Sequence, residues 1–248
     1  MRAALILTAA VLVATAGCSG SADDAGASAS PSPAVSDSAS QAVIGEPVGK
    51  PNGIGDLSPA QILDKAGKAA LSARSVHLIG TSPQTSLDLV VTQDSSDGTR
   101  TAGDVTLQTR VVDGVIYLKA DQAYWTQAFN AKIAAKIGNK WVAGELSNPK
   151  LKTFKETSTM GPLMKQFLVS DESAQVGQAG VAQGQPAVPL TGSIGTLWVA
   201  STGKPYPLLL TSSPDQPEAS QVEFTEWDKK VVITAPPKKQ TISLVDLA

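Results

Sequence analysis

Hydrophobic and polar residues alternate on both sides of one two-residue turn in the middle of the chain. Asp113-Gly114 separates the two runs, and this dipeptide favours a type I′ turn between antiparallel strands. The predicted register places Val105, Leu107, Thr109, Val111, Ile116, Leu118 and Ala120 on one face. The other face carries Thr106, Gln108, Arg110, Tyr117 and Lys119. We therefore expect a hairpin with one face against a core and the other in water.

Helical spacing appears in three other stretches. Leu57–Ala73 predicts an opening helix, with Ser58 as N-cap, Pro59 at the first helical position and Gln61 completing a capping box. A second helix is expected from the N-cap Asp121 to a stop at Gly138. Its apolar positions recur every four residues, at Trp125, Phe129, Ile133 and Ile137. A third amphipathic segment contains Met160, Leu163, Met164, Phe167 and Leu168.

Strand patterns account for most of the remaining chain. Two short runs around Val76–Leu78 and Leu87–Val91 precede Asp94–Gly98, which we interpret as a turn-rich loop. The later predicted strands are Ser173–Val181, Gln185–Leu190, Gly195–Ser201, Pro205–Thr211, Ser220–Trp227 and Lys229–Ala235, with Pro236-Pro237 ending the last one. This order of elements predicts an α+β fold with a single antiparallel sheet and helices grouped on one side.

The N-terminal segment has the pattern of a lipoprotein signal peptide. Arg2 and a short apolar run precede Ala16-Gly17-Cys18, which resembles the bacterial lipobox. We expect residues 1–17 to be the signal peptide and Cys18 to be lipidated. Residues 18–56, rich in Ser, Ala and Pro, are expected to be a disordered tether, and residues 57–248 the folded domain. Cys18 is the only cysteine, so the domain has no disulfide.

The charge of the chain excludes nucleic acid as a partner but leaves open whether one lysine-rich stretch contacts lipid. The formal net charge of −2 gives no basic surface of the kind that binds nucleic acid. Between Lys119 and Lys165, however, the chain contains eight lysines and only three acidic residues. This run is either a solvated helix face or a surface that lies against anionic lipid.

The residues predict no catalytic site, no metal site and no cofactor. A Ser-His-Asp triad would need His77, the only histidine, and no Gly-x-Ser-x-Gly motif is present to hold its serine. Glu223 and Glu226 fall on opposite sides of a strand, and the other acids are scattered. We therefore expect a protein that is not an enzyme.

Several stretches together resemble a known family. They are Leu57–Ala66, Val112–Asp121 followed by Tyr124-Trp125, Gly195–Val199, and Val222–Asp228 followed by Val231–Pro237. In this order, behind a lipobox, they resemble the actinobacterial LppX/LprG-type lipoproteins (LppX_LprAFG). The resemblance implies a LolA/LolB-like fold, a curved and unclosed antiparallel half-barrel whose concave face is covered by helices.

The resemblance also implies a function. Several members of this family take acyl chains of glycolipids or lipoglycans into an apolar cavity between sheet and helices. The expected protein is a monomer, anchored at the extracytoplasmic face of the cell membrane, that binds lipids or glycolipids and carries or transfers them. The residues expected to line that cavity are Leu107, Val111, Ile116, Leu118, Trp125, Phe129, Ile133, Met160 and Met164. The same residues would equally form a filled core. Two alternatives therefore stay open: an interaction module that supports a membrane protein, and a cell-envelope hydrolase with a polar cleft.

Overall fold

The computed structural model describes residues 49–213 and 220–247 of the chain. The predicted signal peptide, Cys18 and most of the predicted tether lie outside the described residues. Asn52 to Asp56, at the end of the predicted tether, contact the domain. The Asn52 side-chain amide donates to the Ala200 carbonyl at 2.9 Å, and Ile54, in the 3₁₀ helix η1 (Ile54–Asp56), is 1% exposed.

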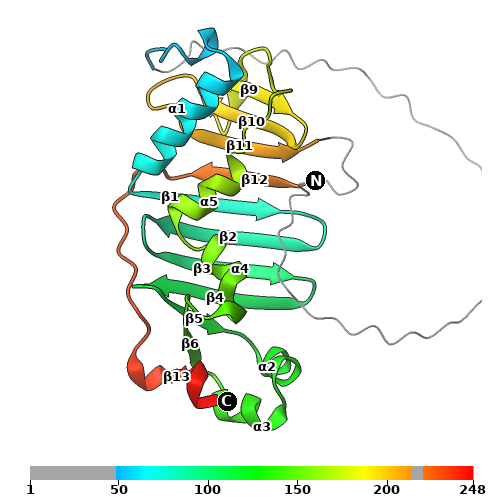
Figure 1. The fold of residues 1–248 in the computed structure, drawn as a ribbon, viewed down its shortest axis with the longest axis vertical. Helices are drawn as coiled ribbons and strands as arrows, with labels where there is room; N and C mark the ends of the chain where they lie inside the picture. Colours follow the sequence, from blue (N-terminus) through cyan, green and yellow to red (C-terminus); the bar gives the residue numbers. More distant parts are fainter. Residues whose placement is uncertain (1–48, 214–219, 248) are drawn as a thin grey trace, which may run out of the picture.

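One large sheet forms the body of the molecule (Figure 1). Its first six strands are β1 (Ser75–Thr81), β2 (Thr85–Thr92), β3 (Ser96–Ala102), β4 (Val105–Val112), β5 (Val115–Lys119) and β6 (Trp141–Glu145). The others are β7 (Gln175–Val176), β8 (Gly180–Ala182), β9 (Gln185–Gly192), β10 (Gly195–Ala200), β11 (Pro207–Ser212), β12 (Gln221–Thr225) and β13 (Thr241–Ser243). The strand order is β13-β6-β5-β4-β3-β2-β1-β12-β11-β10-β9-β7, and β8 also pairs with β9.

This order joins two meanders edge to edge. β1 to β6 follow one another along the chain, and β12 returns to pair with β1 in antiparallel fashion. The strand order runs from β13 at one edge to β7 at the other, so the sheet is unclosed. Among the described strands only the β13–β6 pair is parallel, so the sheet is mostly antiparallel. The predicted α+β class with one unclosed, curved antiparallel sheet is confirmed.

Five α-helices accompany the sheet: α1 (Pro59–Ser72), α2 (Gln122–Ala128), α3 (Ala131–Ile137), α4 (Lys152–Glu156) and α5 (Met160–Phe167). Short 3₁₀ helices are η2 (Pro149–Leu151), η3 (Lys238–Gln240) and η4 (Leu244–Leu247). In Figure 1, α1, α5 and α4 cross the same face of the sheet, while α2 and α3 lie at its β6 end. The chain between β6 and β7 therefore returns over this inner face.

Two local predictions are confirmed in detail. Val111 pairs with Ile116 and Thr109 with Leu118, as the hairpin register requires. Asp113 and Gly114 both have positive φ, 52° and 77°, which a type I′ turn needs. In α1, the Ser58 side chain accepts from the Gln61 backbone and the Gln61 side chain accepts from the Ser58 backbone, so the capping box is complete.

The buried hydrophobic residues divide into two main clusters. The α1–α5 cluster joins α1 and α5 to β1, β2 and β9–β12, and it includes Ile62, Leu78, Leu89, Leu163 and Phe224. The α2–α3 cluster joins α2 and α3 to β4, β5 and β6, and it includes Leu107, Val111, Ile116, Trp125 and Val142. β3 lies between them in the sheet and contributes to neither cluster.

The single helix expected from Asp121 to Gly138 is wrong, because the structure breaks it into α2 and α3. Asp121 caps α2 as expected, by accepting from Tyr124 N, and Gly138 ends α3. Between the two helices, the Asn130 side chain accepts from Ile133 N at 2.9 Å and starts a new helix. Asparagine competes with the helical backbone for hydrogen bonds, so it favours a cap over a helix interior.

Several predicted strand assignments are also wrong. Asp94–Gly98 is not a loop throughout, since β3 begins at Ser96, and β6 was not predicted. Lys229–Ala235 pairs with no strand and instead runs along one side of the sheet toward β13 (Figure 1). There Arg110 Nη1 donates to the Thr234 carbonyl at 3.0 Å. Pro236-Pro237 does not end the last strand, because β13 follows.

Candidate functional site

The nine residues expected to line a lipid cavity lie in two separate places. Leu107, Val111, Ile116, Leu118 and Trp125 are buried in the α2–α3 cluster, against which Ile133 packs. Met160 and Met164 are buried in the α1–α5 cluster instead. Phe129, the C-cap residue of α2, is 38% exposed and stacks on Trp125.

Two pockets open between the helices and the sheet or its loops, and none of those nine residues lines either one. The first, of about 300 Å³, lies among the start of α1, the end of α5 and strands β9–β11. Its apolar walls are Leu63, Phe167, Val169, Leu190, Ile194, Leu197 and Leu210. The second, of about 400 Å³, is bounded by residues 146–149 and by Lys155, Glu156 and Pro162. Sequence reasoning missed both: the first forms where segments distant in the chain meet, and the second where the chain after β6 folds against α4 and Pro162.

The inner face of β3 is polar, unlike its neighbours. Register places Arg100 between Leu87 of β2 and Leu107 of β4, and Ser96 between Val91 and Val111. These four neighbours are buried hydrophobic residues, so Ser96 and Arg100 face the same side as the two clusters. β3 thus forms a polar strip between the two apolar parts of the inner face.

Arg100 is the charged member of this strip. Its Nη2 donates to the Thr157 carbonyl at 3.0 Å, at the end of α4. Burial lowers the pKa of the guanidinium from 12.5 to about 10, because desolvation disfavours the charged form. Arg100 is therefore a cation at neutral pH, held under the helices that cross the sheet.

Three buried side-chain atoms of the described residues have no hydrogen-bond partner: Arg100 Nε, Thr109 Oγ1 and Trp125 Nε1. Thr109 and Trp125 are each 2% exposed. Leaving such a group unpaired costs about 1–3 kcal/mol, so each one calls for an explanation. They belong to β3, β4 and α2, respectively, and the first two strands are neighbours in the sheet.

The one histidine of the chain has a structural partner. His77 Nε2 lies 2.8 Å from Asp88 Oδ1 on the neighbouring strand. Within the described ranges, no group of three or more His, Cys, Asp or Glu side chains is arranged to hold a metal ion. In those same ranges, no helix is both long and apolar enough to cross a membrane.

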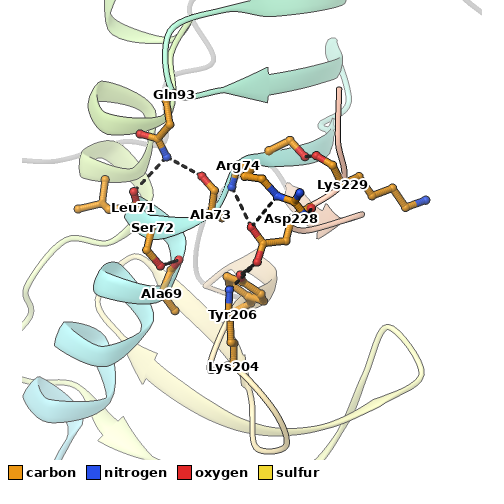
Figure 2. Close-up of polar contacts among 11 residues, drawn as sticks. Ala69, Leu71, Ser72, Ala73, Arg74, Gln93, Lys204, Tyr206, Asp228 and Lys229 are labelled. Carbon is orange, nitrogen blue, oxygen red and sulfur yellow. Dashed lines mark hydrogen bonds and ion pairs between the residues drawn. The ribbon is translucent and has the colours of Figure 1, made fainter. Parts of the chain in front are cut away.

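A polar cluster around Asp228 ties three segments together (Figure 2). Arg74 N donates to Asp228 Oδ1 at 2.9 Å, while Lys204 Nζ and Tyr206 Oη donate to Oδ2. The hydrogen bond from Lys204, followed by those from the Arg74 backbone and Tyr206, holds the pKa of Asp228 well below its usual range. These contacts join the start of β1, the β10–β11 turn and the residues after β12, so the cluster is structural.

Comparison with known proteins gives a fold but no sequence family. No family model matches the chain, and no curated protein sequence matches it. LprF from Mycobacterium bovis has a similar structure, with a TM-score of 0.50 and 17% identity over 72% of this chain and 98% of that one. The lipoprotein LppX from Mycobacterium tuberculosis is similar with a TM-score of 0.48 and 18% identity, over 71% of this chain and 100% of that one.

The likeness to LprF defines the class of fold. An unclosed, mostly antiparallel sheet with helices across one face is the LppX/LprG-type, LolA-like fold, as the sequence motifs predicted. At 17% identity this likeness concerns the fold alone.

Proposed function

We propose that this chain is an extracytoplasmic, membrane-anchored lipoprotein that binds lipids or glycolipids through their acyl chains, without catalysing a reaction. The observation that carries the proposal is an unclosed sheet whose inner face is largely apolar and covered by helices instead of by a second sheet. Helices that contact a sheet through side chains alone can separate from it without breaking the strand ladder. An acyl chain would then replace the helix contacts on the same apolar face.

The pocket beside Leu63 supports this proposal. Its volume of about 300 Å³ is at the lower end of the range for ligand pockets, about 300–1,000 Å³. Its walls come from α1, from the segment around the end of α5 and from β9–β11, so it enlarges if either helix moves. We propose that it is the point at which an acyl chain enters.

The proposal is tested by lipid binding. Protein purified from its own host should yield lipid on organic extraction, and delipidated protein should bind a fluorescent acylated probe. If wild-type protein yields no lipid and binds no such probe, the lipid-binding function is wrong.

A paired substitution on α1 tests the position of the entrance. Leu63 lines the pocket, whereas Leu71, on the same helix, is 47% exposed and lines neither pocket. Leu63→Trp should weaken probe binding about tenfold while lowering the free energy of unfolding by less than about 1 kcal/mol, because the larger ring occupies empty volume. Leu71→Trp should leave the affinity unchanged. Equal affinities for both variants would show that the chain enters elsewhere.

One observation favours the interaction module as a second candidate. Seven of the nine residues expected to line a cavity are buried in packed clusters, among them Val111 and Ile116 at 0% exposure. A permanently filled core would leave the outer surface to carry the function. Absence of lipid in the extraction experiment would make this candidate the first.

A further inference from the structure

The strongest unexplained feature of the molecule is the polar strip that crosses its apolar inner face. Arg100 lies in register between Leu87 and Leu107, one from each of the two main clusters. Apolar residues at the inner positions of β3 would have joined the apolar surfaces of β2 and β4 into one continuous face. A cavity that bound only acyl chains would need no polar group there. An arginine at this position costs desolvation and returns no apolar contact through its charged end.

The groups without partners share one chemistry. Arg100 Nε and Trp125 Nε1 are donors only, and the Thr109 hydroxyl can donate as well. Thr109 is two residues from Leu107 along β4 and lies opposite Gly98, which has no side chain to meet its hydroxyl. Trp125 packs in the same cluster as Leu107. Of the three, Arg100 and Thr109 lie on adjacent strands, so a ligand that approached both would have to present hydrogen-bond acceptors.

The positive charge of Arg100 indicates which chemical class of ligand the strip would bind. The recorded bond of the guanidinium is to the neutral carbonyl of Thr157, and desolvation is the cause of its lowered pKa, with no carboxylate among the causes. Guanidinium groups form their strongest hydrogen bonds with phosphate and carboxylate oxygens, which they bind through paired donors. An anion would therefore replace the Thr157 carbonyl with a stronger partner and also reach Nε.

We propose that Arg100, with Thr109 on the neighbouring strand, forms the head-group site of the bound lipid and that the ligand is a lipid with an anionic head group, phosphate or carboxylate. This inference rests on the proposed lipid-binding function and adds the chemical class of the lipid. The acyl chains lie against the apolar parts of the inner face, and the anion lies on the polar strip under α4.

The test compares three probes that carry the same fluorescent acyl chain: phosphatidylglycerol, a free fatty acid and uncharged diacylglycerol. Arg100→Met keeps an unbranched side chain and removes the charge. It should weaken binding of the anionic probe that fits the site by about tenfold or more, and diacylglycerol binding by less than about twofold. The phosphatidylglycerol and fatty-acid arms distinguish a phosphate from a carboxylate as the anion.

Arg110→Met is the matched control. Arg110 lies on β4 facing the opposite side of the sheet, where it is paired with Asp97 through two hydrogen bonds of 2.8 and 3.0 Å. This variant should bind all three probes as the wild type does. Equal weakening of charged and uncharged probes by Arg100→Met would assign Arg100 a structural role and overturn the head-group site. Wild-type binding of diacylglycerol as tightly as the anionic probes would overturn it while leaving lipid binding intact, and failure to bind any probe would overturn the proposed function itself.

Discussion

At the scale of single residues, the alternation of apolar and polar positions in the β4–β5 hairpin decided which side chains are buried. Val111 and Ile116 are fully buried and Leu118 is 7% exposed, whereas Gln108, on the opposite face, is exposed. The reason is the two-residue period of a strand, which the turn at Asp113-Gly114 fixes in register. Alternation alone does not account for Gly98. Its φ is 156°, and a Cβ added at this position would lie 2.0 Å from the Asp88 carbonyl oxygen. A residue that looks like part of a turn is thus required inside a strand.

Adjacent substitutions on β5 test the register. Leu118→Asp should lower the free energy of unfolding by at least about 3 kcal/mol, since it loses the burial of a leucine and places a charge in the α2–α3 cluster. Lys119→Asp should cost less than about 1 kcal/mol, because Lys119 contributes one cation–π contact with Trp141, at 5.9 Å. Chemical denaturation of both variants measures the difference. Similar losses would mean that the two faces are not distinguished.

Two carboxylates, Asp171 and Asp228, make the stability of the folded state depend on pH. Hydrogen bonds to Asp171, first from the Ser173 side chain and then from the Ser193 backbone, hold its pKa well below the ordinary 3.8, and Asp228 is lowered in the same direction. A carboxyl group whose pKa is lower in the folded state stabilises that state above the unfolded pKa, and this contribution disappears as the pH falls. The melting temperature should therefore drop steadily below about pH 4.

Asp228→Asn isolates one of these contributions. At neutral pH the variant should melt at a lower temperature than the wild type, because the Lys204 ammonium loses its charged partner. The gap should narrow as the pH falls below about 4, because the unfolded wild-type carboxyl then binds a proton that the folded carboxylate, with its lowered pKa, does not. Asp104→Asn, which changes an exposed carboxylate in the β3–β4 turn, is the control and should follow the wild type at every pH. A gap that stays constant with pH would contradict this account of Asp228.

At the scale of elements, capping residues decided where helices begin. The Ser58 capping box and the Asp121 cap were both read correctly from the sequence, because these are local hydrogen bonds. The break at Asn130 was not, since the apolar spacing from Trp125 to Ile137 continues through it. The local cap overrode the four-residue period and left Phe129 outside the core.

Asn130→Ala tests this explanation of the break. Loss of an N-cap side chain costs about 0.5–2 kcal/mol, so chemical denaturation should show a decrease of about 1 kcal/mol. Lys132→Ala, on the exposed side of α3, is the control and should lie within about 0.5 kcal/mol of the wild type. An Asn130→Ala variant as stable as the wild type would show that tertiary packing, and not the cap, separates α2 from α3.

At the scale of the whole molecule, the pairing of β1 with β12 makes one sheet out of two meanders. The α4–α5 segment then crosses the inner face from the β6 end toward the β9 end (Figure 1). This path places helices over the apolar face without a second sheet. Residues 229–237 belong to no strand and connect β12 to β13 at the opposite end of the sheet (Figure 1).

Membrane attachment is a prediction about the whole chain. We expect Cys18 to carry the lipid anchor, because it follows an apolar run and the small residues Ala16 and Gly17. Cys18→Ser should move the protein from the membrane fraction to the soluble fraction, or leave the precursor unprocessed. Cell fractionation and the intact mass of the protein measure both effects. A variant that matures and fractionates like the wild type would contradict lipidation at this residue.

The sequence alone determined the features that depend on neighbours in the chain: the β4–β5 register, the helix caps of α1 and α2, the buried faces of α1 and α5, and the α+β class. Only the tertiary structure decided the features that depend on distant segments. β3 has almost no apolar residues, so no alternating pattern predicts it. It forms a strand because β2 and β4 pair with it on either side. The division of the core into two clusters follows from that strand, and the two pockets and the unpaired donors likewise depend on packing that local patterns do not show. Local patterns fix conformation over a few residues, whereas a binding site is made where the fold brings distant residues together.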